Sequence, residues 1–255
     1  MKSKSIWITG ASSGIGEALA DFYATPGTTL AILAPSESKL RVVAERCREK
    51  GAVVYEYTAD VRDIENSRKY AGHFLEQVGS VDIVIANAGI RGVEDEEFQE
   101  WQIPEELMQV NYMGVINTFS PFISFMKKKR SGQLVVISSI AAWCGTPNSG
   151  AYSASKAAVN IWCEGLRLRL APYGIHVTVI CMGFVATAMT EGLPFSLPGL
   201  LTAKEAAVLI STNIARRKRV VTLPWQSRFI WAVFRVIPGF MYDKLILWAK
   251  ARHAK

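Results

Sequence analysis

Residues 5–16 of the chain read Ser-Ile-Trp-Ile-Thr-Gly-Ala-Ser-Ser-Gly-Ile-Gly, an apolar strand pattern that runs straight into closely spaced glycines. A helical pattern follows over Gly14–Ala24. Glycine permits a tight turn and lets backbone approach a pyrophosphate, and a helix N-terminus offers free N–H groups to it. A plain strand–helix turn is the alternative that this motif alone leaves open. The candidate phosphate contacts are Gly10, Ser12, Ser13, Gly14, Ile15 and Gly16.

Beyond this stretch, apolar runs rich in β-branched residues alternate with helical patterns. Predominantly apolar runs such as Val81–Ala86 are typical of strands that are covered on both faces. The predicted strands are Ser5–Thr9, Thr28–Ala34, Ala52–Tyr57, Val81–Ala86, Gln133–Ser138, Ile175–Cys181 and Arg219–Leu223. The predicted helices are Gly14–Ala24, Glu37–Lys50, Asp63–Val78, Pro104–Arg130, Tyr152–Pro172 and Ala203–Arg217. The alternation predicts an α/β, doubly wound Rossmann sandwich with a seven-stranded parallel sheet and helices on both faces.

The composition fits one globular domain over residues 1–255, with 50% hydrophobic and 20% charged residues. The four cysteines are scattered, which favours a reducing compartment such as the cytoplasm over a disulfide framework. The three histidines lie far apart in the sequence and predict no metal site. The first apolar run is too short for a signal peptide, and no apolar run is long enough to span a membrane.

The end of the second predicted strand indicates which dinucleotide binds. An acid about 20 residues beyond the glycines would bond the ribose 2′-hydroxyl and favour NAD. Here the strand ends at Ala34 and continues as Pro35-Ser36, with Glu37 in the first turn of the next helix. Ser12, Ser13 or Ser36 could donate to a 2′-phosphate, and Lys39 or Arg41 could reach it. The pattern favours NADP, with NAD as the alternative.

Tyr152-Ser153-Ala154-Ser155-Lys156 places a phenol and an ammonium on one helix face, four residues apart. A nearby lysine stabilises a phenolate and lowers its pKa from about 10, which suits an acid/base near neutral pH. Ser139 ends the fifth predicted strand, where its hydroxyl could polarise a substrate carbonyl. Taken singly, each feature is also common on exposed helices and at strand ends.

In this order, the motifs resemble those of the short-chain dehydrogenase/reductase family over nearly the whole chain. They are Thr9-Gly10-x-x-x-Gly14-Ile15-Gly16, Asp60-Val61, Asn87-Ala88-Gly89, Asn111, Ser139 and Tyr152-x-x-x-Lys156. The resemblance implies hydride transfer between a nicotinamide and a carbonyl or secondary alcohol. Tyr152 would be the acid/base, Lys156 would hold the nicotinamide ribose, Ser139 would position the carbonyl, and Asn111 would hold a water. Asp60, with Val61, would contact adenine, and Asn87-Ala88-Gly89 would pass beside the adenine ribose.

One departure from the family pattern follows the sixth predicted strand, where Met182-Gly183 stands in place of Pro-Gly. Methionine does not restrict φ as proline does, so a less rigid loop is expected around the nicotinamide contacts Gly183, Val185 and Thr187. Apolar residues dominate the segments after strands five and six, and no arginine is expected nearby to clamp an anion. We therefore expect an apolar carbonyl or alcohol substrate, although these side chains could simply pack the lid. The candidate pocket residues are Trp143, Cys144, Phe184, Met189, Leu193 and Phe195.

The charge is unevenly distributed along the chain. The formal net charge is +7, yet residues 216–255 hold ten Lys/Arg and a single acid, Asp243. Residues 224–255 read as a basic, aromatic, helical C-terminal extension. A subunit interface in a homodimer or homotetramer, or a cover of the substrate entrance, is the first interpretation. Peripheral membrane contact through residues 225–255 is the second. Nucleic acid is not expected, because no recognition element accompanies the charge.

Two other functions remain possible at this point. A non-catalytic nucleotide-sensing module could use the same fold, but it would not need Asn111, Ser139, Tyr152 and Lys156 together. A sugar epimerase or dehydratase also uses Tyr-x-x-x-Lys, but such chains are usually longer and space their glycines differently. An NADP-preferring oxidoreductase of apolar carbonyls is therefore the leading hypothesis.

Overall fold

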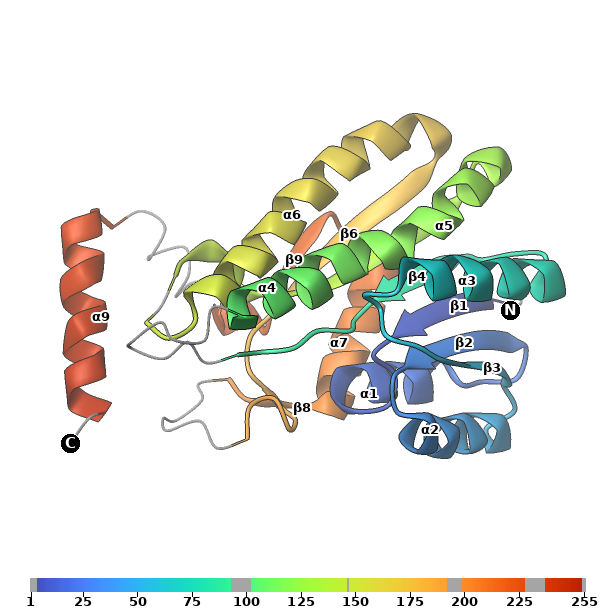
Figure 1. Ribbon diagram of the computed structural model, residues 1–255, viewed down its shortest axis with the longest axis horizontal. Helices are drawn as coiled ribbons and strands as arrows, with labels where there is room; N and C mark the ends of the chain where they lie inside the picture. The colour runs from blue at the N-terminus through green and yellow to red at the C-terminus, as the bar shows by residue number, and fades with distance from the viewer. Residues whose placement is uncertain (1–3, 93–101, 146, 192–198, 228–236, 254–255) are drawn as a thin grey trace.

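A computed structural model describes residues 4–92, 102–145, 147–191, 199–227 and 237–253. A seven-stranded parallel sheet runs through its centre between helical layers (Figure 1). The strand order is β3-β2-β1-β4-β5-β6-β9, which confirms the predicted doubly wound fold. The strands are β1 (Lys4–Thr9), β2 (Thr28–Ala34), β3 (Val53–Thr58), β4 (Ile83–Ala86), β5 (Gly132–Ser139), β6 (Ile175–Met182) and β9 (Val220–Leu223).

Helices cover both faces of this sheet and create two apolar cores. Side chains alternate along each strand, so Ile6 and Ile8 enter one core while Trp7 enters the other. Trp7 stacks on Tyr57 and contacts Phe74 and Phe122. The helices of the first core are α1 (Gly14–Tyr23), α2 (Glu37–Glu49) and α7 (Ala203–Ala215). Those of the second are α3 (Ile64–Val78), α5 (Gly114–Lys129) and α6 (Gly150–Leu170).

The predicted helix Pro104–Arg130 is interrupted. It begins earlier as α4 (Gln102–Met108), passes through a π-helical turn, η1 (Gln109–Met113), and resumes as α5. Three short elements were not predicted: a 3₁₀ turn after β5 and two strands that form a separate parallel pair. They are η2 (Ile140–Trp143), β7 (Val185–Ala186) and β8 (Leu201–Thr202). A further 3₁₀ turn, η3 (Ala171–Tyr173), ends α6.

The C-terminal extension includes helix α9 (Gly239–His253), which begins directly after Pro238. Figure 1 shows α9 standing beside the sandwich, at the end where β5 and β6 terminate. Within the described residues, no helix is long and apolar enough to cross a bilayer. The basic run Arg216–Arg219 does not belong to this extension, because it links α7 to β9 of the main sheet.

Candidate active site

The glycine loop lies at the carboxyl end of β1, where ligands bind in open α/β sheets. Gly10 and Gly14 adopt φ values of +66° and +57°, which side chains rarely tolerate. A Cβ on Gly16 would overlap the carbonyl oxygen of Gly10, so only glycine lets α1 approach the loop so closely. The sequence prediction of a tight strand–helix turn is therefore confirmed in atomic detail.

Asn87 fastens this loop from the end of β4. Its side-chain amide donates to the carbonyl oxygens of Thr9 and Gly10, each at 3.1 Å. The backbone N–H groups of Asn87 and Ala88 donate to the Thr9 hydroxyl at 3.2 and 3.3 Å. The Asn87 side chain thus supports the glycine loop, a role that sequence reasoning missed. The expected path of Asn87-Ala88-Gly89 beside a ribose stays a prediction.

The start of α1 fits the phosphates of a dinucleotide. Ser13 occupies the N-cap position, but its side chain makes no capping hydrogen bond and is exposed, while Ser12 is half-buried. The hydroxyl of Ser13 and the first N–H groups of α1 are therefore free to donate to an anion. Ile15 is half-buried and packs on the first core.

The end of β2 is neutral, as predicted. Ser36 caps α2 by position, without a side-chain capping bond. Glu37 is exposed and accepts a 2.6 Å hydrogen bond from Arg41 one turn later. Ser36 can therefore face a ribose substituent, while Arg41 is engaged by its own helix.

Asp60, which the resemblance places at adenine, is held by a neighbour. The Arg62 side chain donates to it at 2.7 and 3.0 Å, and the Arg62 backbone N–H at 2.8 Å. These bonds hold the pKa of Asp60 below its usual value. Val61 beside it is buried. The adenine contact itself stays a prediction.

Ser139 and Tyr152 meet at the end of β5. The Ser139 hydroxyl accepts from the Ala141 N–H at 3.1 Å, which fixes its position at the start of η2. Burial raises the pKa of the Tyr152 phenol, and a hydrogen bond with the Ser139 side chain opposes that rise. The pair predicted from two separate motifs is thus brought together in space.

Lys156 lies beneath this pair, one helical turn after Tyr152. Its side chain is buried and donates to the Ile137 carbonyl at 3.2 Å, with Nζ 5.9 Å from the centroid of the Tyr152 ring. Burial lowers the pKa of Lys156 to about 8. The expected lowering of the Tyr152 pKa by Lys156 is not seen here, because burial penalises both charged forms.

Asn111 sits in the π-helical turn η1 and is fully buried. Its amide donates to the Ile90 carbonyl at 3.0 Å and to the Ser155 hydroxyl at 3.1 Å, and its oxygen accepts from the Ile90 N–H at 2.9 Å. Ser155 in turn donates to the Tyr152 carbonyl. Asn111 therefore ties the segment after β4 to α6, and a π turn is a common feature of functional sites. Its water-holding role stays a prediction.

Arg91 is the second residue missed by sequence reasoning. Its positive charge acts on the Tyr152 phenol and lowers the pKa of that group, against the larger effect of burial. The expectation that no arginine clamps a substrate anion stays a prediction, although the charge of Arg91 acts on the phenol. Arg91 follows Asn87-Ala88-Gly89-Ile90 after β4, a segment that approaches α6 only in the fold.

The loop after β6 is held by backbone pairing, although it lacks the family's proline. Gly183 donates to the Leu223 carbonyl at 2.6 Å, and Val185 and Ala186 pair with β8. The Thr190 hydroxyl donates to the Val185 carbonyl at 2.6 Å. Thr187 lies so near the glycine loop that a Cβ on Gly14 would be 3.1 Å from its Cγ2. These contacts anchor the loop where the sequence predicted weaker restraint.

The candidate substrate pocket is only partly described. Cys144 and Phe184 are half-buried, and Met189 is 41% exposed. Trp143 borders a cavity between α6, β6 and β9. Leu193 and Phe195 lie outside the described residues. The grouping of these side chains around one substrate stays a prediction.

Two expectations concern cysteines and metals. All four cysteines are free thiols. The described residues contain no cluster of His, Cys, Asp and Glu suited to a metal ion.

Known proteins are similar to this chain in sequence and in fold. Residues 4–195 match the family model of the short chain dehydrogenases. The 11-beta-hydroxysteroid dehydrogenase A of Sesamum indicum is 33% identical, over 91% of this chain and 72% of its own length. An alcohol dehydrogenase of Thermococcus sibiricus, solved with 5-hydroxy-NADP, is 29% identical, with a TM-score of 0.77, over 86% of this chain and 94% of its own.

A short chain dehydrogenase/reductase of Burkholderia phymatum, solved with NAD, has a TM-score of 0.83 at 25% identity. It covers 91% of this chain and 92% of its own length. The two cofactors in these structures both belong to the nicotinamide class, and the glycine loop described above is suited to it. The chain belongs to the short-chain dehydrogenase/reductase family and is an NAD(P)-dependent oxidoreductase of CH–OH and C=O groups.

Proposed function

We propose that the protein interconverts an apolar ketone and its secondary alcohol, with Tyr152 as the acid/base. The observation that supports this most directly is the meeting of Ser139 and Tyr152 above the buried Lys156. Nicotinamide, when bound, supplies or accepts the hydride. In reduction, the Ser139 hydroxyl orients the carbonyl oxygen and the Tyr152 phenol donates a proton to it. Lys156 and Arg91 then stabilise the phenolate that remains.

The raised pKa of Tyr152 has a chemical consequence. The phenol is protonated at neutral pH, which is the form that reduction requires. Oxidation requires the phenolate, so a second cation must approach or the burial must be relieved. Lys156 would hold the nicotinamide ribose when the cofactor is bound, and its ammonium, 5.9 Å from the centroid of the Tyr152 ring, is the cation placed to favour the phenolate.

The substrate is proposed to be apolar because the segments after β5 and β6 carry partly exposed apolar side chains, among them Cys144, Phe184 and Met189. The name of the Sesamum relative, a hydroxysteroid dehydrogenase, fits such a substrate. NADP is the proposed cofactor because Ser36 leaves the end of β2 without a carboxylate.

A carbonyl and alcohol panel tests this function, followed at 340 nm with NADPH and NADH. Tyr152→Phe removes the proton donor, so kcat should fall by about 10²–10⁴ while NADPH affinity stays within a factor of two. Tyr173→Phe, at the far end of α6, is the matched control and should leave kcat unchanged. A rival function, a nucleotide sensor, would be supported if NADPH binds but no substrate turns over and Tyr152→Phe changes nothing.

The exposed face of α9 is proposed to contact a second copy of the chain. Phe240, Leu247 and Trp248 are each more than half exposed, although they are apolar. Sedimentation velocity of a chain ending at Pro238 should show a smaller assembly than the full chain. An unchanged mass, with loss of binding to anionic vesicles, would instead favour a lipid surface.

A further inference from the structure

The amino ends of the strands, opposite the active site, collect positive charge. Helices α5, α6 and α7 all end there, and each carries basic residues in or just after its last turn. Cations are favoured at helix C-termini by the helix dipole. Figure 1 shows α5 and α6 ending far from α9. The residues concerned are Lys127, Lys128, Lys129, Arg130, Arg167, Arg169, Arg216, Arg217, Lys218 and Arg219.

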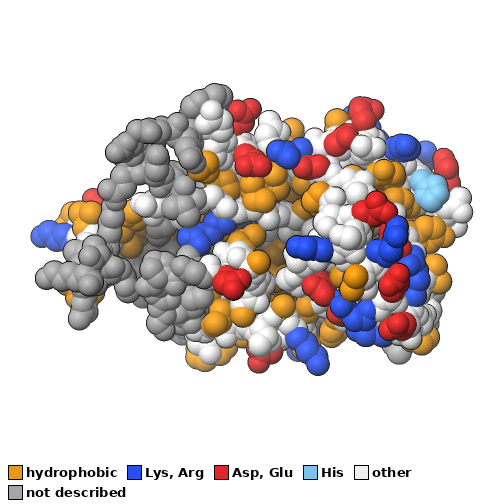
Figure 2. Space-filling view, turned by 60° about the horizontal axis from the view of Figure 1, so that its bottom comes forward, with side chains coloured by type: hydrophobic (Ala, Val, Ile, Leu, Met, Phe, Trp, Pro, Cys, Tyr) orange, Lys and Arg blue, Asp and Glu red, His pale blue; other side chains and the backbone are white. Residues whose placement is uncertain are grey.

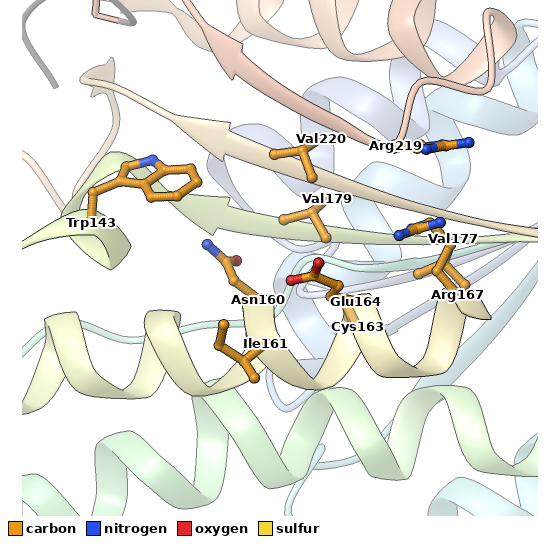
Figure 3. Close-up of a pocket in the computed structure, with 10 residues that line it drawn as sticks. All are labelled: Trp143, Asn160, Ile161, Cys163, Glu164, Arg167, Val177, Val179, Arg219 and Val220. Atoms are coloured by element: carbon orange, nitrogen blue, oxygen red, sulfur yellow. The ribbon is translucent and has the colours of Figure 1, made fainter. Parts of the chain in front are cut away.

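Three of these arginines line a hollow. Arg167 from α6, together with Arg217 and Arg219 from the turn before β9, borders a cavity of about 370 Å³ that also includes His176. A neighbouring cavity of about 300 Å³ shares Arg167, Val177 and Arg219. Figure 3 shows Arg167 and Arg219 side by side at one end of this second cavity, with Trp143 at the other. The helix dipole explains basic residues here, but not their convergence on a hollow.

Arg217 is held over the hollow by an unusual backbone. It adopts φ +50°, which costs conformational energy in a residue with a side chain. Its guanidinium donates to Nε2 of His176 at 3.1 Å. The imidazole must be neutral to accept this bond, and burial followed by the Arg217 charge lowers the pKa of His176 accordingly. His176 therefore orients Arg217 without neutralising it.

The arginines of the hollow have one acid near them, Glu164, which lies one helical turn before Arg167 and lines the neighbouring cavity. Within the described parts of the chain, no ion pair joins a carboxylate to Arg167, Arg217 or Arg219. Arginine stays charged in proteins, so these groups repel one another unless an anion lies between them.

We propose that Arg167, Arg217 and Arg219 bind a phosphate-class dianion, either free phosphate or the phosphate of a small ester. Planar guanidinium forks match tetrahedral oxyanions in two-point hydrogen bonds. Val177, Val179 and Val220 in the neighbouring cavity offer an apolar surface to the organic part of an ester. The site lies at the amino ends of the strands, whereas the glycine loop lies at their carboxyl ends. The length of one strand such as β6, about 20 Å, separates the two.

The shape of the site favours the ester over the free ion. Free phosphate uses the arginines alone, whereas phenyl phosphate also buries its ring against the valines. We therefore expect phenyl phosphate to bind about tenfold more tightly than inorganic phosphate. Equal affinities would assign the site to free phosphate.

Calorimetric titration of the NADPH-saturated protein at pH 8 tests the proposal, since NADPH occupies the glycine loop and phosphate is then a dianion. Inorganic phosphate and phenyl phosphate should each give one saturable site. The double variant Arg167→Gln/Arg219→Gln should weaken both at least tenfold. Arg169→Gln, exposed on the same helix but outside the cavity, should change neither by more than twofold.

Three results would overturn the site. The first is no saturable heat with either probe. The second is unchanged affinity in the double variant, with circular dichroism confirming that it folds. The third is an equal loss in Arg169→Gln, which would show a diffuse charge effect. None of these measurements depends on turnover. The anion site can therefore be confirmed or refuted even if the proposed ketone substrate proves wrong.

Discussion

The two walls of the active site are built in different ways. On the cofactor wall, Gly10, Gly16 and Asn87 are in such close contact that no added atom fits. On the substrate wall, Cys144 and Phe184 are half-buried and Met189 is largely exposed. Figure 2 shows that apolar side chains lie exposed among charged and polar ones on the described part of one face.

This difference follows from what each wall must recognise. A dinucleotide is bound by backbone groups, and close backbone approach requires glycine at set positions. An apolar substrate is bound by side-chain area, which many combinations of residues supply. Single substitutions in the cofactor wall should therefore cause large losses of cofactor affinity. Single substitutions in the substrate wall should cause small, graded effects.

Gly16→Ala tests the cofactor wall with the largest expected effect. The new Cβ would overlap the Gly10 carbonyl oxygen and the Asn87 amide, so the loop must shift away from the phosphate path. NADPH affinity should fall by more than about a hundredfold, and stability by about 1–3 kcal/mol. Fluorescence titration and urea unfolding measure the two effects.

Gly72→Ala is the matched control for this substitution. A Cβ at Gly72 in α3 meets nothing within 4 Å, so helix propensity should stabilise the protein by about 1 kcal/mol. Unchanged NADPH affinity in Gly16→Ala would show that the cofactor wall tolerates an added atom, and the proposed difference between the two walls would be wrong.

Ser36→Asp tests whether the end of β2 selects NADP over NAD. A carboxylate at the end of β2 repels a 2′-phosphate and accepts a bond from a 2′-hydroxyl. NADPH affinity should fall about tenfold, which is about 1.4 kcal/mol, while NADH affinity should hold or rise. Separate titrations with the two cofactors measure this. A similar loss for both cofactors would mean that the carboxylate does not distinguish a 2′-phosphate from a 2′-hydroxyl.

The cofactor wall could be predicted from the sequence for the same physical reason. Glycine spacing is local, and strands buried on both faces read as continuous apolar runs. The predicted strand Thr28–Ala34 matches β2 at both ends, and Ala52–Tyr57 is shifted by one residue from β3. Close backbone approach therefore requires glycines that can be recognised in a short stretch of sequence.

Contacts between distant segments leave no such pattern. Asn111 was identified as a site residue, but the helical periodicity of the sequence encodes neither the π turn around it nor its bonds to Ile90 and Ser155. The approach of Arg91 to Tyr152 spans 61 residues, and that of Tyr242 to Gly145 spans 97. These arrangements depend on the finished fold.

Lys156 lies between the walls and provides a smaller effect that depends on pH. Its folded pKa of about 8 is below its unfolded value of 10.5, so the unfolded chain binds the extra proton between those two values. The stability of the wild type, relative to Lys156→Met, should therefore rise between pH 7 and pH 9, by about 1 kcal/mol. Urea unfolding of both cofactor-free proteins measures the difference. A constant difference across this range would mean that the buried ammonium is not penalised.

Tyr242→Phe tests the substrate wall, with the smallest expected effect. Tyr242 and Ile246 are half-buried on α9, and the Tyr242 hydroxyl donates to the Gly145 carbonyl. We propose that this contact holds α9 against the segment after Ser139, as a cover of the substrate entrance. Its loss should expose Cys144, which is half-buried while Cys47, Cys163 and Cys181 are buried.

The rate at which iodoacetamide alkylates Cys144 reports on this cover. The rate depends on both the pKa of the thiol and its accessibility, so the two effects must be separated. Burial raises the pKa of Cys144, and the hydrogen bond with Tyr242 lowers it, so Tyr242→Phe alone should move the midpoint of the pH–rate curve upward. The rate at the high-pH plateau depends on access, and it should rise two- to threefold as α9 loosens. Tyr173→Phe should alter neither quantity. A plateau rate unchanged by Tyr242→Phe would mean that α9 stays in place without the hydroxyl. The substrate wall would then be as rigid as the cofactor wall.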